Sequence, residues 1–193
     1  LLSLSSGGVC LEWWRKNLTV AADGSLIPFD VINEEVAKRK AAEDGLFFYP
    51  FSGNAAPDRK FQKASFIGLD LSHDRFDIAR AIMEGVAFQA IWMMESFKTK
   101  PSKEGLKLAG GASKSALWCQ MVADIANLPV RIPEVADLAC VGAAIMAGTG
   151  CGIYSSVEEG YVIQPDPARA QMYAKLYAQY KKCAGTLGEV YGL

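Results

Sequence analysis

The sequence is poor in the groups that several common kinds of site require. It has a single histidine, His73, in the polar stretch 70–74, and one histidine beside two acids makes a poor metal site. Its five cysteines show no Cys-x-x-Cys spacing, which argues against zinc and dithiol motifs. No serine stands in a Gly-x-Ser-x-Gly context. We therefore expect no metal ligands in the chain and no serine-hydrolase triad.

The sequence also has little excess charge and no long apolar run. It carries 20 Lys and Arg against 21 Asp and Glu, so no basic field is present to hold nucleic acid. No continuous apolar stretch approaches the ~20 residues that span a membrane. Four of the five cysteines have apolar neighbours, so we expect reduced, buried thiols. These features predict a cytoplasmic protein without a nucleic-acid or membrane partner.

The chain is long enough to form one sizeable core. It has 193 residues, of which 51% are hydrophobic. It opens with Leu1-Leu2-Ser3-Leu4, which reads as part of a strand and has neither a methionine nor a basic leader. We expect the chain to be part of a longer protein.

Hydrophobic periodicity predicts an α/β domain, because strands and helices alternate from Phe66 onward. Gly85 within a long apolar helix, and the small residues of the helix at 139–147, predict close packing against neighbouring backbone. Asn33 is expected to cap a short helix. The predicted strands lie at 1–5, 46–51, 66–69, 106–109 and 129–133, and the predicted helices at 9–18, 34–43, 75–97, 112–128, 139–147 and from 167 to near the end.

The stretch 106–118 is the first candidate for a ligand site. A short apolar strand runs into Gly110-Gly111 and then into a helix, which suits a nucleotide because glycines let a ligand approach the backbone and a helix start offers N–H groups. The stretch is not a Walker A loop, since Ser113 precedes Lys114-Ser115, and it lacks the third glycine of a dinucleotide fingerprint. An ordinary tight turn remains the alternative.

The first helix offers a second candidate. Gly8 and Glu12 are four residues apart and share one helix face, so a ligand against Gly8 would lie within reach of Glu12. The alternative for Glu12 is a solvated charge on an amphipathic helix. The turn-rich segment at 52–59 is a loop of the kind that often borders a site.

Taken together, six motifs resemble the C-terminal half of the FGGY carbohydrate kinases, and the likeness spans nearly the whole chain. Among the members of that family, the xylulose kinases look nearest. The motifs lie at 7–15 (GGVCLEWWR), 49–57 (YPFSGNAAP), 67–69 (IGL), 80–88 (RAIMEGVAF), 109–124 (AGGASKSALW with a later Ala-Asp) and 141–147 (VGAAIMA).

The resemblance implies a ribonuclease H-like domain of the actin, hexokinase and sugar-kinase ATPase superfamily, with a mixed sheet flanked by helices. The whole chain, 1–193, would be the C-terminal nucleotide-binding domain, which closes over a cleft against an N-terminal sugar-binding domain absent from this sequence. ATP or ADP with Mg²⁺ is the implied ligand. By resemblance, its adenosine moiety contacts Gly111 and Ser115, with Gly110 and Ala112 in the same motif and Gly8 and Glu12 from the first helix.

The implied activity is ATP-dependent phosphorylation of a sugar hydroxyl. A ketopentose such as xylulose is the first candidate, and ribulose, gluconate, glycerol or another polyol are alternatives. The catalytic base of the family lies in the N-terminal half, so no catalytic residue is expected in this chain, and the chain alone should be inactive. A non-catalytic protein with a degenerate nucleotide cleft, or a plain structural domain, remain rival hypotheses, and the sequence leaves a homodimer open.

Overall fold

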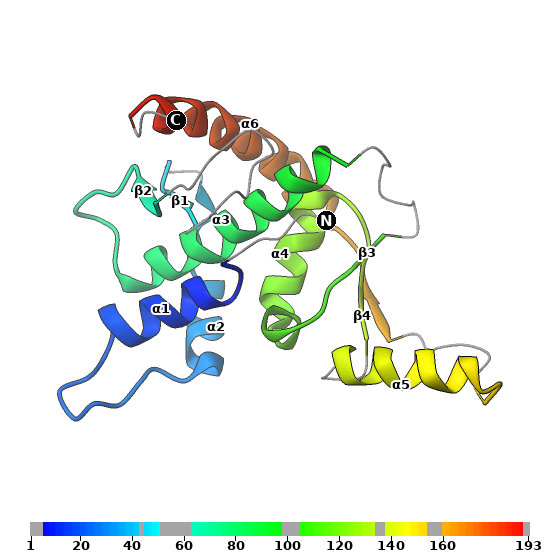
Figure 1. Cartoon of the computed structure of the whole chain (residues 1–193). Helices are drawn as coiled ribbons and strands as arrows, with labels where there is room; N and C mark the ends of the chain where they lie inside the picture. The colour runs from blue at the N-terminus through cyan, green and yellow to red at the C-terminus, as the bar shows by residue number, and fades with distance from the viewer. Residues whose placement is uncertain are drawn as a thin grey trace.

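The structure is a computed structural model that describes residues 6–42, 45–50, 63–97, 105–133, 138–153 and 160–190 (Figure 1). The strand expected at 1–5 and the loop expected at 52–59 lie outside these ranges. Within them, the helices are α1 (Val9–Leu18), α2 (Phe29–Ala37), α3 (Arg75–Glu95), α4 (Ala116–Ala126), α5 (Leu138–Gly150), α6 (Pro167–Val190) and the 3₁₀ turn η2 (Gly111–Lys114). The strands are β1 (Phe47–Tyr49), β2 (Ser65–Ile67), β3 (Leu106–Lys107), β4 (Val130–Ile132) and β5 (Tyr161–Ile163).

The α/β alternation expected from the sequence is confirmed, with two differences. α2 begins at Phe29 rather than after Asn33, because extended Pro28 precedes it and starts the helix earlier. Asn33 therefore lies inside the helix and does not cap it. The sequence also did not predict β5, a short strand of which two residues are exposed, so its hydrophobic pattern is weak.

The strands form two small sheets. β1 pairs with β2 in antiparallel fashion, with Phe48 opposite Phe66. β3 and β4 are parallel, whereas β4 and β5 are antiparallel, so this three-stranded sheet is mixed, as expected. Helix α4 lies against β4 and β5 and connects the mixed sheet to the rest of the domain.

Helix α3 lies at the centre of the larger part of the molecule, where it contacts α1, α2, α4 and β1 (Figure 1). It is buried on several sides, as its run of Ala79, Ile82, Met83, Val86 and Phe88 requires. Gly85 in this helix meets the backbone carbonyl of Phe48 in β1, where a Cβ would collide. The close approach predicted at Gly85 is therefore confirmed.

Strand β1 divides the core into two parts because its side chains alternate between its faces. Phe48 packs with Trp14, Ile82 and Trp118 in one cluster. Phe47 and Tyr49 point the other way and pack with Phe88, Tyr173 and Tyr180, where the Tyr49 and Tyr180 rings stack at 4.4 Å. The second cluster attaches α6 to the domain.

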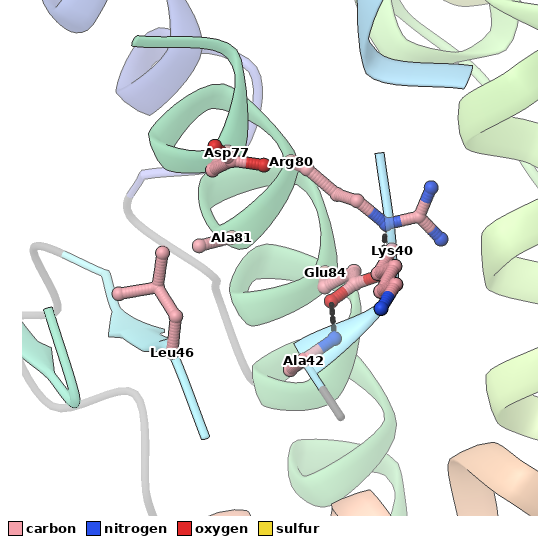
Figure 2. Close-up of a pocket in the computed structure, with 7 residues that line it drawn as sticks. All are labelled: Lys40, Ala42, Leu46, Asp77, Arg80, Ala81 and Glu84. Carbon is pink, nitrogen blue, oxygen red and sulfur yellow. Dashed lines mark hydrogen bonds and ion pairs between the residues drawn. The ribbon is translucent and has the colours of Figure 1, made fainter. Parts of the chain in front are cut away.

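A buried polar network around Glu84 joins three distant segments. Figure 2 shows its contacts with Arg80 and Ala42. One Glu84 carboxylate oxygen accepts hydrogen bonds from Arg80 Nε and Tyr173 Oη, both at 2.8 Å, and the other accepts from the Ala42 N–H at 3.1 Å. Burial raises the pKa of Glu84, although these three donors stabilise its carboxylate. Because both carboxylate oxygens of Glu84 have hydrogen-bond partners, the network fixes α3 to α6 and to the segment before β1.

The start of α6 is held by a second buried carboxylate. Asp124 of α4 accepts hydrogen bonds from the Asp166 N–H at 2.7 Å and from Arg169 Nε at 2.6 Å. Asp166 caps the helix through the Arg169 N–H, and Pro167 is its first residue, as the sequence predicted.

Two packing expectations are wrong in part. Described residues of α5 are mostly exposed, including Met146 at 79%, so the small residues of this helix do not lie against a close neighbour in the part of the chain that the structure describes. None of the five cysteines forms a disulfide, but Cys140 and Cys151 are exposed, whereas Cys10 and Cys119 are buried. Apolar neighbours in the sequence did not ensure burial because α5 projects away from the core (Figure 1).

Replacing Gly85 with alanine tests the contact between α3 and β1. We expect Gly85→Ala to lower the free energy of unfolding by about 2 kcal/mol, because the collision with the Phe48 carbonyl outweighs the gain in helix propensity. Gly185→Ala in α6 is the matched control: its Cβ meets no atom within 4 Å, so it should stabilise by up to about 1 kcal/mol. Urea unfolding measures both, and equal stability of the two variants would contradict the proposed collision.

Replacing Tyr173 with phenylalanine tests the Glu84 network. Tyr173→Phe removes a buried donor to a carboxylate and should lower the free energy of unfolding by about 2 kcal/mol. Tyr177→Phe removes a hydrogen bond of the same length, 2.8 Å, to Glu95 at the surface, and should cost about 0.5 kcal/mol or less. Thermal or urea unfolding would show the difference, and similar losses would argue against a special role of the buried network.

Candidate functional site

A pocket of about 400 Å³ lies where α1, α2 and the turn before α4 meet. Such a volume is within the range of roughly 300–1,000 Å³ typical of small-molecule sites. The residues that line it are Gly8, Leu11, Phe29, Asn33, Gly111, Lys114, Ser115 and Trp118. The structure therefore brings three of the predicted site residues, Gly8, Gly111 and Ser115, around one cavity, although they come from opposite halves of the chain.

The two glycines at the pocket leave its wall open. A Cβ built on Gly8 or on Gly111 meets no atom within 4 Å. Neither residue has a positive φ, so the absence of a side chain there is not required by the backbone. Glycine at these positions instead leaves room for a ligand to approach the backbone.

The turn between β3 and α4 differs from the sequence prediction. Gly110 has a φ of 88°, and the 3₁₀ turn η2 follows it before α4 begins at Ala116. The helix start expected directly after the glycine pair is therefore displaced by four residues. The N–H of Trp118 at that start is already bound by the side chain of Ser115.

The Ser115 hydroxyl makes two hydrogen bonds within the protein, one as acceptor and one as donor. Its hydroxyl oxygen accepts from the Trp118 N–H at 3.1 Å, and its hydroxyl proton is donated to Asn33 Oδ1 at 2.7 Å. Ser115 as a whole residue is 9% exposed. It thus links the start of α4 to the middle of α2, and one face of the pocket is fixed by this link.

Gly110 and Ala112 are in the same turn but do not line the pocket. Gly110 supplies the left-handed backbone that reverses the chain, and its carbonyl accepts from the Ser113 N–H at 3.2 Å. Ala112 packs against the core cluster that contains Trp118 and Met121. These two residues shape the turn and do not border the cavity.

Glu12 also lies outside the pocket lining. Its carboxylate is paired with Lys16 at 3.0 Å and with Arg15 at 3.2 Å, both on its own helix. The hydrogen bond from Lys16, aided by Arg15, lowers the pKa of Glu12, so the side chain is charged at neutral pH. The shared face with Gly8 is present, but the carboxylate is held by the cations of α1.

Five pocket residues were not identified from the sequence: Leu11, Phe29, Asn33, Lys114 and Trp118. Phe29 and Asn33 are one helical turn apart, a spacing that places both on one face of α2. The sequence prediction misses this spacing because it begins the helix at residue 34, with Asn33 as its cap. Lys114 is the one charged residue among those that line the pocket.

The lining of the pocket combines apolar and polar side chains. Leu11 and Trp118 are buried, and the Trp118 indole donates to the Met83 carbonyl at 2.9 Å, which fixes the ring. Phe29 is 47% exposed, and the Arg15 guanidinium lies 4.6 Å from the centre of its ring. Asn33, Ser115 and Lys114 supply the polar side. Such a pocket can take a flat, partly apolar ring that also bears hydrogen-bonding atoms.

Other hollows of the described structure are less suited to a ligand. The space beside Glu84, shown in Figure 2, has a volume of about 10 Å³, which is close to that needed by one water molecule. A wider hollow of about 500 Å³ lies between Leu18, the 19–28 segment and Arg75, and it is open to solvent. Within the described ranges no three His, Cys, Asp or Glu residues form a potential metal site, and no helix there could cross a membrane.

Comparison with known proteins shows the family. Residues 3–151 match the C-terminal domain of the FGGY family of carbohydrate kinases. The L-xylulose/3-keto-L-gulonate kinase of Escherichia coli (strain K12) is 31% identical over 194 residues, which cover 95% of this chain and 37% of that protein. The glycerol kinase of Janthinobacterium sp. (strain Marseille) is 31% identical over 157 residues, covering 79% of this chain and 30% of the kinase.

A solved structure supports the same fold. The gluconate kinase from Lactobacillus acidophilus superposes with a TM-score of 0.81 at 24% identity, over 98% of this chain and 40% of that one. This chain therefore shares the fold of a solved sugar kinase, and the expected α/β class with a mixed sheet flanked by helices is confirmed. The chain spans less than half the length of these relatives. With a family match over most of its length, this chain belongs to the FGGY family of carbohydrate kinases.

Proposed function

We propose that this chain is the nucleotide-binding domain of an ATP-dependent carbohydrate kinase, and that the pocket between α1, α2 and η2 holds the adenosine moiety. The observation that carries the proposal is the convergence of Gly8, Gly111 and Ser115 on one cavity. Apolar Leu11 and Trp118 suit the faces of a purine, and the polar residues suit its edge and the ribose. Glu12, Gly110 and Ala112 do not line the pocket. They would contribute indirectly, by shaping α1 and the turn that carry the lining residues.

The charge of the pocket agrees with a phosphorylated ligand. Lys114 is exposed at its border and carries the single charge of the described lining. The carboxylate of Glu12, which would repel phosphates, is neutralised by Arg15 and Lys16. Mg²⁺ would come with the nucleotide, because this ion is commonly held by substrate phosphates and only one or two carboxylates.

The reaction proposed for the whole protein is in-line transfer of the γ-phosphoryl group to a sugar hydroxyl. Such catalysis depends on positioning and on neutralising the charge of the transferred group, which domain closure completes. This chain would contribute the binding and orientation of the nucleotide. The general base and the sugar pocket would lie in a partner domain of the same polypeptide, and the domain alone would transfer no phosphate.

The acceptor proposed first is a ketopentose such as xylulose, and the cytoplasm is the proposed location. The E. coli relative, an L-xylulose/3-keto-L-gulonate kinase, aligns over 95% of this chain and supports this choice. Glycerol and gluconate remain alternatives, since a glycerol kinase and a gluconokinase of Bacillus subtilis (strain 168) are also similar.

Nucleotide binding can be tested at Gly111. Gly111→Val should weaken ADP binding at least tenfold, because the added side chain would occupy the pocket that Gly111 lines, while its Cβ meets no protein atom within 4 Å. Gly185→Val in α6, likewise in open space, is the matched control and should bind ADP as the wild type does. Isothermal titration measures the affinities, and thermal unfolding should show both variants folded. Wild-type affinity in Gly111→Val would overturn the placement of the nucleotide.

Catalysis can be tested with an acceptor panel on the full-length protein. We expect phosphorylation of one of xylulose, ribulose, gluconate or glycerol, with kcat/KM for ATP reduced at least tenfold by Gly111→Val and unchanged by Gly185→Val. Binding of ATP without phosphorylation of any sugar or polyol would instead favour a non-catalytic member of the fold.

A further inference from the structure

We propose that Asn33 reads the base of the bound nucleotide: its side-chain amide, held in one orientation by Ser115, donates a hydrogen bond to a ring nitrogen of adenine. The inference rests on the proposed function and concerns the same pocket. It assigns a specificity-determining role to a residue that lies in the middle of α2, 82 positions before its partner Ser115.

The orientation of the Asn33 amide follows from a chain of hydrogen bonds. The Trp118 N–H donates to Ser115 Oγ at 3.1 Å, so the hydroxyl proton is directed elsewhere and is donated to Asn33 Oδ1 at 2.7 Å. The carbonyl end of the amide is thereby fixed toward Ser115, and the NH₂ end is fixed away from it. Each bond in such a chain polarises the next, which makes the amide NH₂ group a better donor.

The NH₂ group of Asn33 has no partner in the described part of the chain. The one hydrogen bond of this side chain is that with Ser115, and Asn33 lines the pocket. The NH₂ group therefore offers the pocket a hydrogen-bond donor. A ligand atom that meets this NH₂ group is an acceptor.

The rest of the pocket favours a flat ring at this position. Phe29 precedes Asn33 by one turn of α2 and lines the same cavity, and Arg15 holds its ring through a contact of 4.6 Å and a hydrogen bond from Nε to the Ile27 carbonyl at 2.6 Å. An aromatic base stacked on Phe29 would present its edge to Asn33. Adenine fits because N1, N3 and N7 are all acceptors in its plane.

In this arrangement Ser115 acts on the nucleotide through Asn33, whereas the family resemblance predicts a direct contact between Ser115 and adenosine. A direct hydrogen bond from its hydroxyl to the ligand would require it to release Asn33, because its single proton is in use. Ser115 is thus a positioning residue, and Asn33 is the residue that contacts the base.

The proposal can be tested with ADP analogues on the full-length protein. Asn33→Leu has a side chain of similar size but no donor, and it should weaken ADP binding about tenfold. Asn33→Asp should weaken ADP binding at least as much, because its carboxylate still accepts from Ser115 but presents an acceptor to the base. Of 1-deaza-, 3-deaza- and 7-deaza-ADP, one should bind wild type about tenfold more weakly than ADP. Asn33→Leu should bind that analogue and ADP equally well.

Ser115→Ala should reduce the discrimination between ADP and that analogue while leaving some ADP binding, and thermal unfolding should show all variants folded. If wild type binds ADP but Asn33→Leu binds it equally well, or if the two proteins discriminate alike among the analogues, the role of Asn33 is wrong while the nucleotide site stands. If wild type binds no ADP, the proposed function fails, and the role of Asn33 with it.

Discussion

The packing of α3 against β1 is the contact on which the rest of the domain depends. Gly85 allows the helix backbone to approach the Phe48 carbonyl, so β1 can bury aromatic side chains on both of its faces. Both core clusters contain residues of α3. Their apolar contacts, together with the Glu84 network, hold α1, α2 and α6 at fixed positions around this helix. A larger residue at position 85 would separate the strand from the helix and disturb both clusters at once.

Helix α4 transmits this rigidity to the pocket. Trp118 packs in the first cluster and Ile125 in the second, whereas Cys119 and Ala123 pack against β4. The residue that caps this helix, Ser115, is also a wall of the cavity. The pocket is therefore attached to the core through short hydrogen bonds, and its polar side chains are held in place before a ligand arrives.

Much of the domain could be predicted from local pattern. The bounds of α1 and the start of α3 agree with the sequence prediction, because apolar residues recur at helical spacing there and Asp74 provides a capping box. Gly8, Gly111 and Ser115 were identified from glycine patterns and family resemblance. Other features were missed. β5 is too short and exposed to show a pattern, and α2 begins directly after Pro28, before the Asn33 that was expected to cap it. The exposure of α5 follows from its position beyond the core.

The sequence by itself determined which residues share a helix face, where the chain turns, and the family to which its motifs point. Those properties depend on neighbours within a few positions along the chain. Only the tertiary structure decided that Gly8, Gly111 and Ser115 border one cavity, and that Ser115 donates to Asn33. The Ser115–Asn33 hydrogen bond joins residues 82 positions apart, so it depends on how α1, α2 and α4 pack around the same cavity. No local sequence pattern encodes such a contact.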